Sequence, residues 1–202
     1  AAKAVQAYAT PNATLAVDSS NGVSSAFALD AVTKYADLIA PTNVFDGNSL
    51  AYRVTKDGVV GNWQSSYSTP KNDGSQDGHY QVEIKQVDGS GNESGVETID
   101  FVLSSMAPDT PNVSLANGVG DGIANGYDTE LVSGDGALIS PTNSPEGSLL
   151  EYKVTYNGQD SGWQSTYQAP ATDGSADGVY NVQVRQTDIA GNVSKVQSID
   201  FT

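Results

Sequence analysis

Carboxylates are the most abundant groups in this sequence that could do chemistry. The chain has 24 acidic residues against 9 basic ones and a net charge of −15 at pH 7. One interpretation is that they keep the protein soluble through self-repulsion. A second, compatible with the first, is that they bind cations, because calcium prefers carboxylate and other oxygen ligands. The same charge repels phosphate backbones and anionic lipid, so neither nucleic acid nor a membrane is an expected partner.

Catalytic groups other than carboxylates are scarce. His79 is the only histidine and there is no cysteine, which removes a Cys nucleophile, thiolate metal sites and disulfides. Carboxylate pairs that hydrolyse glycosides are not excluded by the sequence. The acids recur 100 positions apart, however, as Asp88 and Asp188 do, and this repetition favours an architectural role. We therefore expect no enzyme activity.

The acidic segment 73–78 has the spacing that opens an EF-hand calcium loop. An EF-hand loop requires a glutamate at its twelfth position, where this chain has Ile84, and Val184 in the matching segment. Flanking helices are not expected either. A turn leading into a strand explains the segment better.

An internal repeat of about 100 residues is the strongest pattern in the chain. Shifting the sequence by 100 positions gives about 39 identities in 93 aligned positions, including Trp63–Ser65 on Trp163–Ser165. A unit of this length suits a self-sufficient domain rather than a solenoid repeat. The strand pattern breaks near 104–109, which predicts two domains, residues 1–104 and 105–202.

Hydrophobic residues alternate with polar ones inside each repeat, as expected of antiparallel strands with one face toward a core. Three such segments in the first repeat are 50–54, 80–84 and 99–103. Asp57-Gly58 and Asn157-Gly158 suit tight hairpin turns. The predicted fold is all-β, with two tandem Ig-like antiparallel β-sandwiches of about seven strands each.

Aromatic residues refine this prediction. Tyr80 and Tyr180 each begin an alternating strand, where Ig-like domains place a tyrosine whose hydroxyl turns back onto the chain, the tyrosine corner. Trp63 and Trp163 are interpreted as covering the core. The repeats diverge most over 17–37, which is expected to be an exposed strand and loop.

The segment 177–194 reads DGVYNVQVRQTDIAGNVS, and 86–94 carries a weaker version of its second half. Together with Trp163, Tyr167 and Pro170, it resembles the bacterial Ig-like repeats of large RTX and biofilm-associated surface adhesins. The resemblance implies an extracellular stalk, exported by type I secretion, in which neighbouring repeats of the same chain are the partners. It also implies that calcium between domains stiffens the rod.

In an Ig-like topology, Asp188 and Asn192 should face the linker, which contains Asp109, and Asp77 should approach it from the first repeat. This cluster could supply several oxygens to a calcium ion.

The candidate metal ligands are Asp77, Asp88, Asn92, Asp109, Asp188 and Asn192. Similar repeats usually carry an aspartate where this linker has Ser104, a departure that counts against calcium at the junction. The alternative is that Asp188 and Asn192 only shape a turn, a role that suits both residue types.

Three functions follow from these observations. The first is a structural extender of a bacterial cell-surface adhesin, expected to be a monomer without a ligand of its own. The second is a glycan- or protein-binding module, in which the divergent segments 26–37 or 127–137 carry the site and Tyr35 is the residue to test. The third is an accessory region of a secreted polysaccharide-degrading enzyme.

Overall fold

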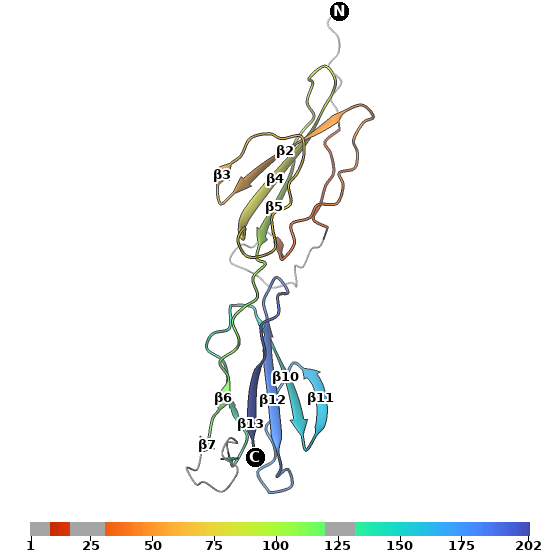
Figure 1. Ribbon diagram of the computed structural model, residues 1–202. Helices are drawn as coiled ribbons and strands as arrows, with labels where there is room; N and C mark the ends of the chain where they lie inside the picture. The colour runs from red at the N-terminus through yellow and green to blue at the C-terminus, as the bar shows by residue number, and fades with distance from the viewer. Residues whose placement is uncertain (1–8, 17–30, 120–131) are drawn as a thin grey trace, which may run out of the picture. The chain divides into compact units, whose positions relative to one another are not determined.

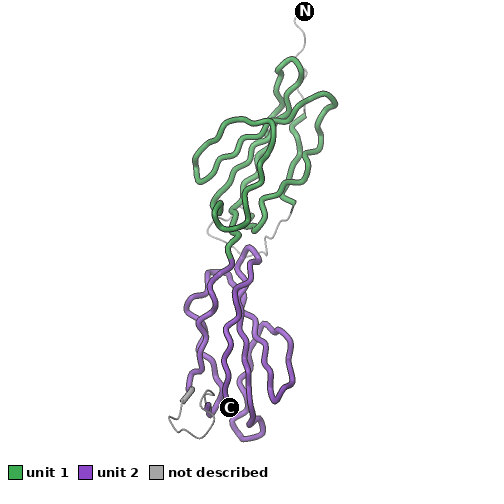
Figure 2. Tube along the Cα trace, in the orientation of Figure 1, with its two compact units in different colours: residues 1–106 green, residues 107–202 purple. Residues whose placement is uncertain are grey.

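The computed structural model describes residues 9–16, 31–119 and 132–202. The chain divides into two compact units, residues 1–106 and 107–202 (Figure 2). The predicted division lay between residues 104 and 105, so the linker residues Ser105 and Met106 belong to the first unit. Each unit is described by itself below.

Unit 1 contains a five-stranded sheet in the order β1-β5-β4-β2-β3 (Figure 1). Its strands are β1 (Ala31–Thr33), β2 (Ser49–Lys56), β3 (Val59–Val60), β4 (Gly78–Val87) and β5 (Glu97–Leu103). All neighbouring strands are antiparallel except β1 and β5, which run parallel. The opposing layer consists of short bridged segments, in which Asn12 pairs with Thr42 and Leu15 with Leu38.

Unit 2 contains a four-stranded antiparallel sheet in the order β11-β10-β12-β13 and two two-stranded sheets, β6-β9 and β7-β8. Its strands are β6 (Ser114–Leu115), β7 (Gly118–Val119), β8 (Val132–Ser133), β9 (Leu138–Ile139), β10 (Leu149–Tyr156), β11 (Gln159–Gln164), β12 (Tyr180–Thr187) and β13 (Gln197–Phe201). The described residues form no helix. The predicted all-β, Ig-like sandwich class is confirmed.

Each unit has a hydrophobic core of its own, made by the alternating residues of its central strands. In unit 1, Val82 and Ile84 of β4 and Phe101 of β5 are fully buried. In unit 2, Val182 and Val184 of β12 occupy the matching positions and are equally buried. The period-two pattern therefore predicted the inward faces correctly, because successive strand residues point to opposite sides of a sheet.

Both predicted tyrosine corners are present. The Tyr80 hydroxyl donates to the carbonyl oxygen of Gln76 at 2.6 Å, and the Tyr180 hydroxyl donates to that of Ala176 at 2.6 Å. Each ring also stacks on the core phenylalanine of its unit. This corner fixes the loop that precedes the strand, which includes the acidic segment discussed below.

The two tryptophans do not cover the core, so this interpretation was wrong. Trp163 lies directly across from Lys153 in the β10-β11 ladder, on the outer face of the sheet. The Arg185 guanidinium carbon lies 4.1 Å from the centre of its ring. Trp63 likewise has the Lys85 ammonium 4.2 Å from its ring centre. The rings are half-buried beneath cations, which are attracted to the negative face of an indole.

The divergent segment 17–37 is only partly described, since residues 17–30 and the facing residues 120–131 lie outside the described ranges. Within the described residues 31–37, the predicted exposure is found at Tyr35 and Asp37, but it is wrong for three other residues. Val32, Thr33 and Ala36 are buried. Val32 and Thr33 are in β1, which pairs with the edge of β5 and extends the sheet.

A buried glutamine anchors unit 1. Gln86 is fully buried, and its Oε1 accepts the Phe45 N–H at 3.0 Å and the Asn48 side-chain amide at 2.9 Å. Its Nε2 donates to the carbonyl oxygens of Ala9 and Asn43. All hydrogen-bonding capacity of this side chain is therefore used inside the protein, as burial of a polar group requires.

The matching Gln186 is satisfied at only one end. Its Nε2 donates to the carbonyl of Asp109 at 2.6 Å, whereas Oε1 has no partner among the described residues. Two differences between the repeats explain this. Pro145 stands where unit 1 has Phe45 and has no N–H to donate, and Ser148 is shorter than the matching Asn48. The buried hydroxyl of Ser148 is also without a partner in the described chain.

Replacing Ser148 by asparagine is expected to stabilise unit 2 by about 1 kcal/mol, because it supplies the missing donor to a buried carbonyl oxygen. The local turn accepts it, since the N–H of residue 148 donates to residue 145 at 3.1 Å, as the N–H of residue 48 does to residue 45. Urea unfolding measures the change. The reverse variant Asn48→Ser should weaken unit 1 by a similar amount, and a destabilising Ser148→Asn would contradict the account.

Candidate functional site

The Asp-Asn pairs predicted as metal ligands close two matching turns. In unit 2, Asp188 Oδ1 accepts the Asn192 backbone N–H at 2.8 Å and Oδ2 accepts the Asn192 side-chain amide at 2.9 Å. In unit 1, the corresponding distances from Asp88 to Asn92 are 2.8 and 2.7 Å. Each turn joins the last two long strands of its sheet. The carboxylates therefore act as local clamps on the backbone, as aspartates in turns do.

Asp109 lies at the same end of unit 2 as the second of these turns. Its carbonyl oxygen accepts from Gln186, which precedes Asp188 by two residues. The residue itself is exposed. The backbone of Asp109 is thereby held beside Gln186, two residues before the Asp188-Asn192 turn.

Asp77 holds the linker of unit 1. Its Oδ2 accepts the backbone N–H groups of Ser105 at 2.9 Å and Met106 at 3.3 Å, and its Oδ1 accepts the Ser105 hydroxyl at 2.6 Å. The Gly74 N–H donates to the same hydroxyl at 2.9 Å. We call this arrangement of Gly74, Asp77, Ser105 and Met106 the linker clasp. It fixes the chain where it leaves the sandwich.

Whether these residues bind a metal ion stays a prediction. Across residues 9–16, 31–119 and 132–202, no three His, Cys, Asp or Glu side chains gather as a set that could hold a metal ion. The carboxylate oxygens of Asp77, Asp88 and Asp188 instead accept hydrogen bonds from the chain itself. Calcium binding that requires residues of both units stays a prediction.

The acidic segment that opens like an EF-hand loop is a pair of turns. Asp73 Oδ1 accepts the backbone N–H and the hydroxyl of Ser75, and Asp173 does the same with Ser175. These bonds stabilise the charged form, with the side-chain hydroxyl contributing most, and lower the pKa of Asp73 and of Asp173. The segment is therefore a turn that leads into the tyrosine corner.

Lowered pKa values predict a loss of stability in acid. Asp73 and Asp173 have folded-state pKa values below the ordinary value of about 3.9, so their contribution is complete above that pH. It is lost as pH falls through the folded-state pKa, so the loss begins below about pH 4. The thermal midpoint of the wild type, measured from pH 7 to pH 2.5, should show it.

The matched control is the double variant Asp73→Asn with Asp173→Asn. Both proteins share the general decrease of negative charge in acid, so the difference between their midpoints isolates the two turns. We expect this difference to be constant above about pH 5 and to shrink below about pH 4. A difference that grows in acid would contradict the assignment.

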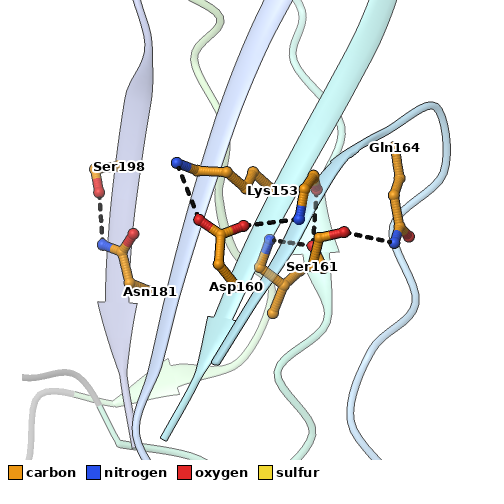
Figure 3. Close-up of polar contacts among 8 residues, drawn as sticks. Lys153, Asp160, Ser161, Gln164, Asn181 and Ser198 are labelled. Atoms are coloured by element: carbon orange, nitrogen blue, oxygen red, sulfur yellow. Dashed lines mark hydrogen bonds and ion pairs between the residues drawn. The ribbon is translucent and has the colours of Figure 1, made fainter. Parts of the chain in front are cut away.

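The outer face of the unit 2 sheet carries a polar network (Figure 3). Lys153 Nζ lies 3.4 Å from Asp160 Oδ2, and Asp160 Oδ1 accepts the Gly162 N–H at 2.7 Å. The Ser161 hydroxyl accepts the Val154 N–H at 3.0 Å. This network lies where the register between β10 and β11 shifts, and it holds Lys153 beside Trp163.

Tyr35, the residue named for a ligand-binding role, is 37% exposed, and the Lys34 ammonium lies 5.5 Å from its ring centre. A glycan- or protein-binding role for it stays a prediction. The other named segments, 26–37 and 127–137, fall partly outside the described residues.

Sequence reasoning missed Gln86, Gln186 and the linker clasp. The two glutamines continue the series of inward-facing residues that begins at Tyr80 and Tyr180. A polar residue at an inward-facing position could therefore have indicated a buried glutamine. The partners of Asp77 lie 28 and 29 residues further along the chain. No local pattern connects such residues.

No helix formed by the described residues is long and apolar enough to span a membrane. No protein-family model matches the chain, and no curated protein matches it.

Among solved structures, two matches are as follows. Fibronectin(III)-like modules of Clostridium thermocellum CbhA match with a TM-score of 0.41 and 10% identity, over 81% of this chain and 81% of that chain. The Bacteroides ovatus mixed-linkage glucan utilization locus protein SGBP-B, solved with a mixed-linkage heptasaccharide, matches with a TM-score of 0.22 and 14% identity, over 85% of this chain and 42% of that chain. Both similarities are too weak to carry a functional inference.

Proposed function

We propose that this chain is a non-catalytic structural module, a pair of spacer domains from an extracellular bacterial surface protein of the adhesin type. The observation that carries the proposal is the use of the repeated acids. In unit 1 the carboxylates of Asp73 and Asp88 bind the backbone of their own turns, and their counterparts Asp173 and Asp188 do the same in unit 2. Carboxylates that are bonded to the backbone in this way stabilise the fold rather than catalyse a reaction.

The polar contacts of the linker support the same role. In a spacer the exit of the chain from each unit must be fixed, and Asp77 fixes it with three hydrogen bonds to Ser105 and Met106. Charge-assisted bonds of this kind are stronger than bonds between neutral groups. The bacterial surface location and type I secretion belong to this proposal and rest on the resemblance to adhesin repeats.

Small-angle scattering tests the spacer role. The 202-residue chain is expected to be a monomer. A single compact globule of this length would have a radius of gyration of about 17 Å, and we expect the measured value to be well above it. A value near 17 Å, or a dimer, would count against a spacer.

The competing role as a ligand-binding module has its own test. Binding to a glycan array that is lost in Tyr35→Ala would favour that role over the spacer. The spacer proposal predicts no binding on the array by either protein.

A further inference from the structure

Unit 1 contains a cavity of about 310 Å³ beside the edge of the sheet that β3 forms (Figure 1). Tyr52, Val54 and Lys56 line it from β2, and several residues between 62 and 70 line it from the chain that follows β3. The cavity is open on one side to solvent, since the lining side chains from this second segment are mostly exposed.

The polar side chains at this cavity are not used to hold the fold together. Asn62, Ser66 and Thr69 are exposed, and within the described part of the chain their side chains form no hydrogen bond. Hydroxyl and amide groups of this kind can both donate and accept hydrogen bonds. They are therefore available to a ligand that does the same.

Unit 2 has different residues at the same place. Tyr156 stands where unit 1 has Lys56, and its ring stacks on Tyr180 with the ring centres 4.6 Å apart. Three further positions have lost a polar side chain, because Asn62, Thr69 and Gln76 of unit 1 match Gly162, Ala169 and Ala176 of unit 2. The polar lining is thus particular to unit 1, whereas the tyrosine and valine frame, Tyr52, Val54 and Tyr80, recurs in both units.

The charge at the cavity is balanced. Of the described residues that line it, only Lys56 is charged, and its Nζ lies 3.5 Å from Asp57 Oδ2. The net charge of −15 further disfavours an anionic ligand. The lining is also too polar for a purely apolar ligand, because the exposed amides and hydroxyls would lose their water without replacement.

Apolar surface lies between the polar groups, from Tyr52 and Val54. A pyranose ring has the matching chemistry, since it carries hydroxyl groups around its edge and C–H groups on its faces. A volume of about 310 Å³ is at the lower end of the range for small-molecule sites, which suits one ring rather than a longer chain of sugars.

We propose that this cavity of unit 1 is a binding site for a single neutral sugar ring, a hexopyranose. The sugar hydroxyls would exchange hydrogen bonds with Asn62, Ser66 and Thr69, and a C–H face of the ring would lie against Tyr52. The site goes beyond the spacer role and does not depend on it. Scattering decides whether the chain is a spacer, whereas sugar binding to unit 1 decides whether the site exists.

Binding through one ring is expected to be weak, with a dissociation constant on the order of millimolar, because so small a ligand gains little free energy. Such a complex dissociates on the order of milliseconds at ordinary association rates. It is therefore lost when a glycan array is washed, so this site is compatible with the absence of array binding expected of a spacer.

The test follows the backbone amide signals of the full chain by NMR while simple sugars are added one at a time. The probes are the methyl glycosides of glucose, galactose, mannose and N-acetylglucosamine. At least one of them is expected to shift the amides of residues 52–56 and 62–70 in a saturable way and to leave those of unit 2 in place. The proposal is overturned if none of the sugars does so, or if glycerol at the same concentration gives the same shifts.

Lys56→Tyr is the matched variant, since unit 2 shows that the fold accepts a tyrosine at this position. Its ring would stack on Tyr80 and fill the cavity, so the affinity for the sugar is expected to fall at least about tenfold. Thr69→Ala, which also introduces the residue of unit 2, should weaken binding by a smaller factor. Tyr35→Ala lies outside the cavity lining and should leave the affinity unchanged.

Two further outcomes would contradict the assignment. If sugar binding survives Lys56→Tyr in a protein that melts as the wild type does, the sugar binds elsewhere. If methyl glucuronide binds and no neutral sugar does, Lys56 is an anion ligand and the site is not one for a neutral ring.

Discussion

Phe101→Ala is expected to destabilise unit 1 by about 3–5 kcal/mol, the usual cost of emptying a buried phenylalanine site. Phe101 is fully buried, and its ring centre lies 5.3 Å from that of Tyr80 in a stacked arrangement. The substitution removes this stacking and leaves a cavity between the two layers of the sandwich. Because a domain of this size is stable by only about 5–15 kcal/mol, the loss should shift its unfolding transition strongly.

The second unit provides the control for this prediction. The cores of the two units share no residue. Phe101→Ala should therefore move the transition of unit 1 and leave that of unit 2, followed by Trp163 fluorescence in the Trp63→Phe background, in place. Phe201→Ala should do the reverse. A cost below about 1 kcal/mol would show that Phe101 is not the centre of the core.

Gln86→Leu is expected to cost about 3 kcal/mol, since it removes four buried hydrogen bonds worth about 1 kcal/mol each and regains a little through apolar packing. The bonds tie β4 to Ala9, Asn43, Phe45 and Asn48. Chemical unfolding monitored by fluorescence measures the change.

Gln186→Leu is the matched variant. Gln186 makes one side-chain hydrogen bond, to Asp109, and its Oε1 is unpaired among the described residues. The expected cost is therefore about 1 kcal/mol or less. If the two substitutions cost the same, the difference between the two glutamines has no energetic meaning, and the stabilisation expected for Ser148→Asn should fail with it.

The sequence alone predicted those features that depend on neighbouring residues. Alternation over a few positions identified Val82 and Ile84 as core residues. Asp57-Gly58 and Asn157-Gly158 form the predicted hairpin turns, with positive φ at all four residues. A turn or a strand face is set by local backbone sterics, which is why short patterns suffice for it.

Features that depend on distant partners were not predicted. Trp163 was assigned to the core because it is large and aromatic, but its face is set by its register against Lys153 and by the irregularity in β10-β11. Gln86 binds Ala9, which is 77 residues away, and the sequence predicted a turn or a metal ligand at Asp77 but not its contacts with Ser105. Such pairs are created by the tertiary fold and leave no signature at short spacing.

Amide hydrogen exchange in excess calcium chelator measures whether the aspartate carboxylates hold the backbone of their own units. The N–H groups of Ser105, Asn92 and Asn192, each bonded to an aspartate carboxylate, are expected to exchange at least about tenfold more slowly than in an unfolded chain. Exchange at unfolded-chain rates in chelator, with protection only when calcium is added, would contradict the account. In that case a metal ion, and not the protein's own hydrogen bonds, would organise these turns.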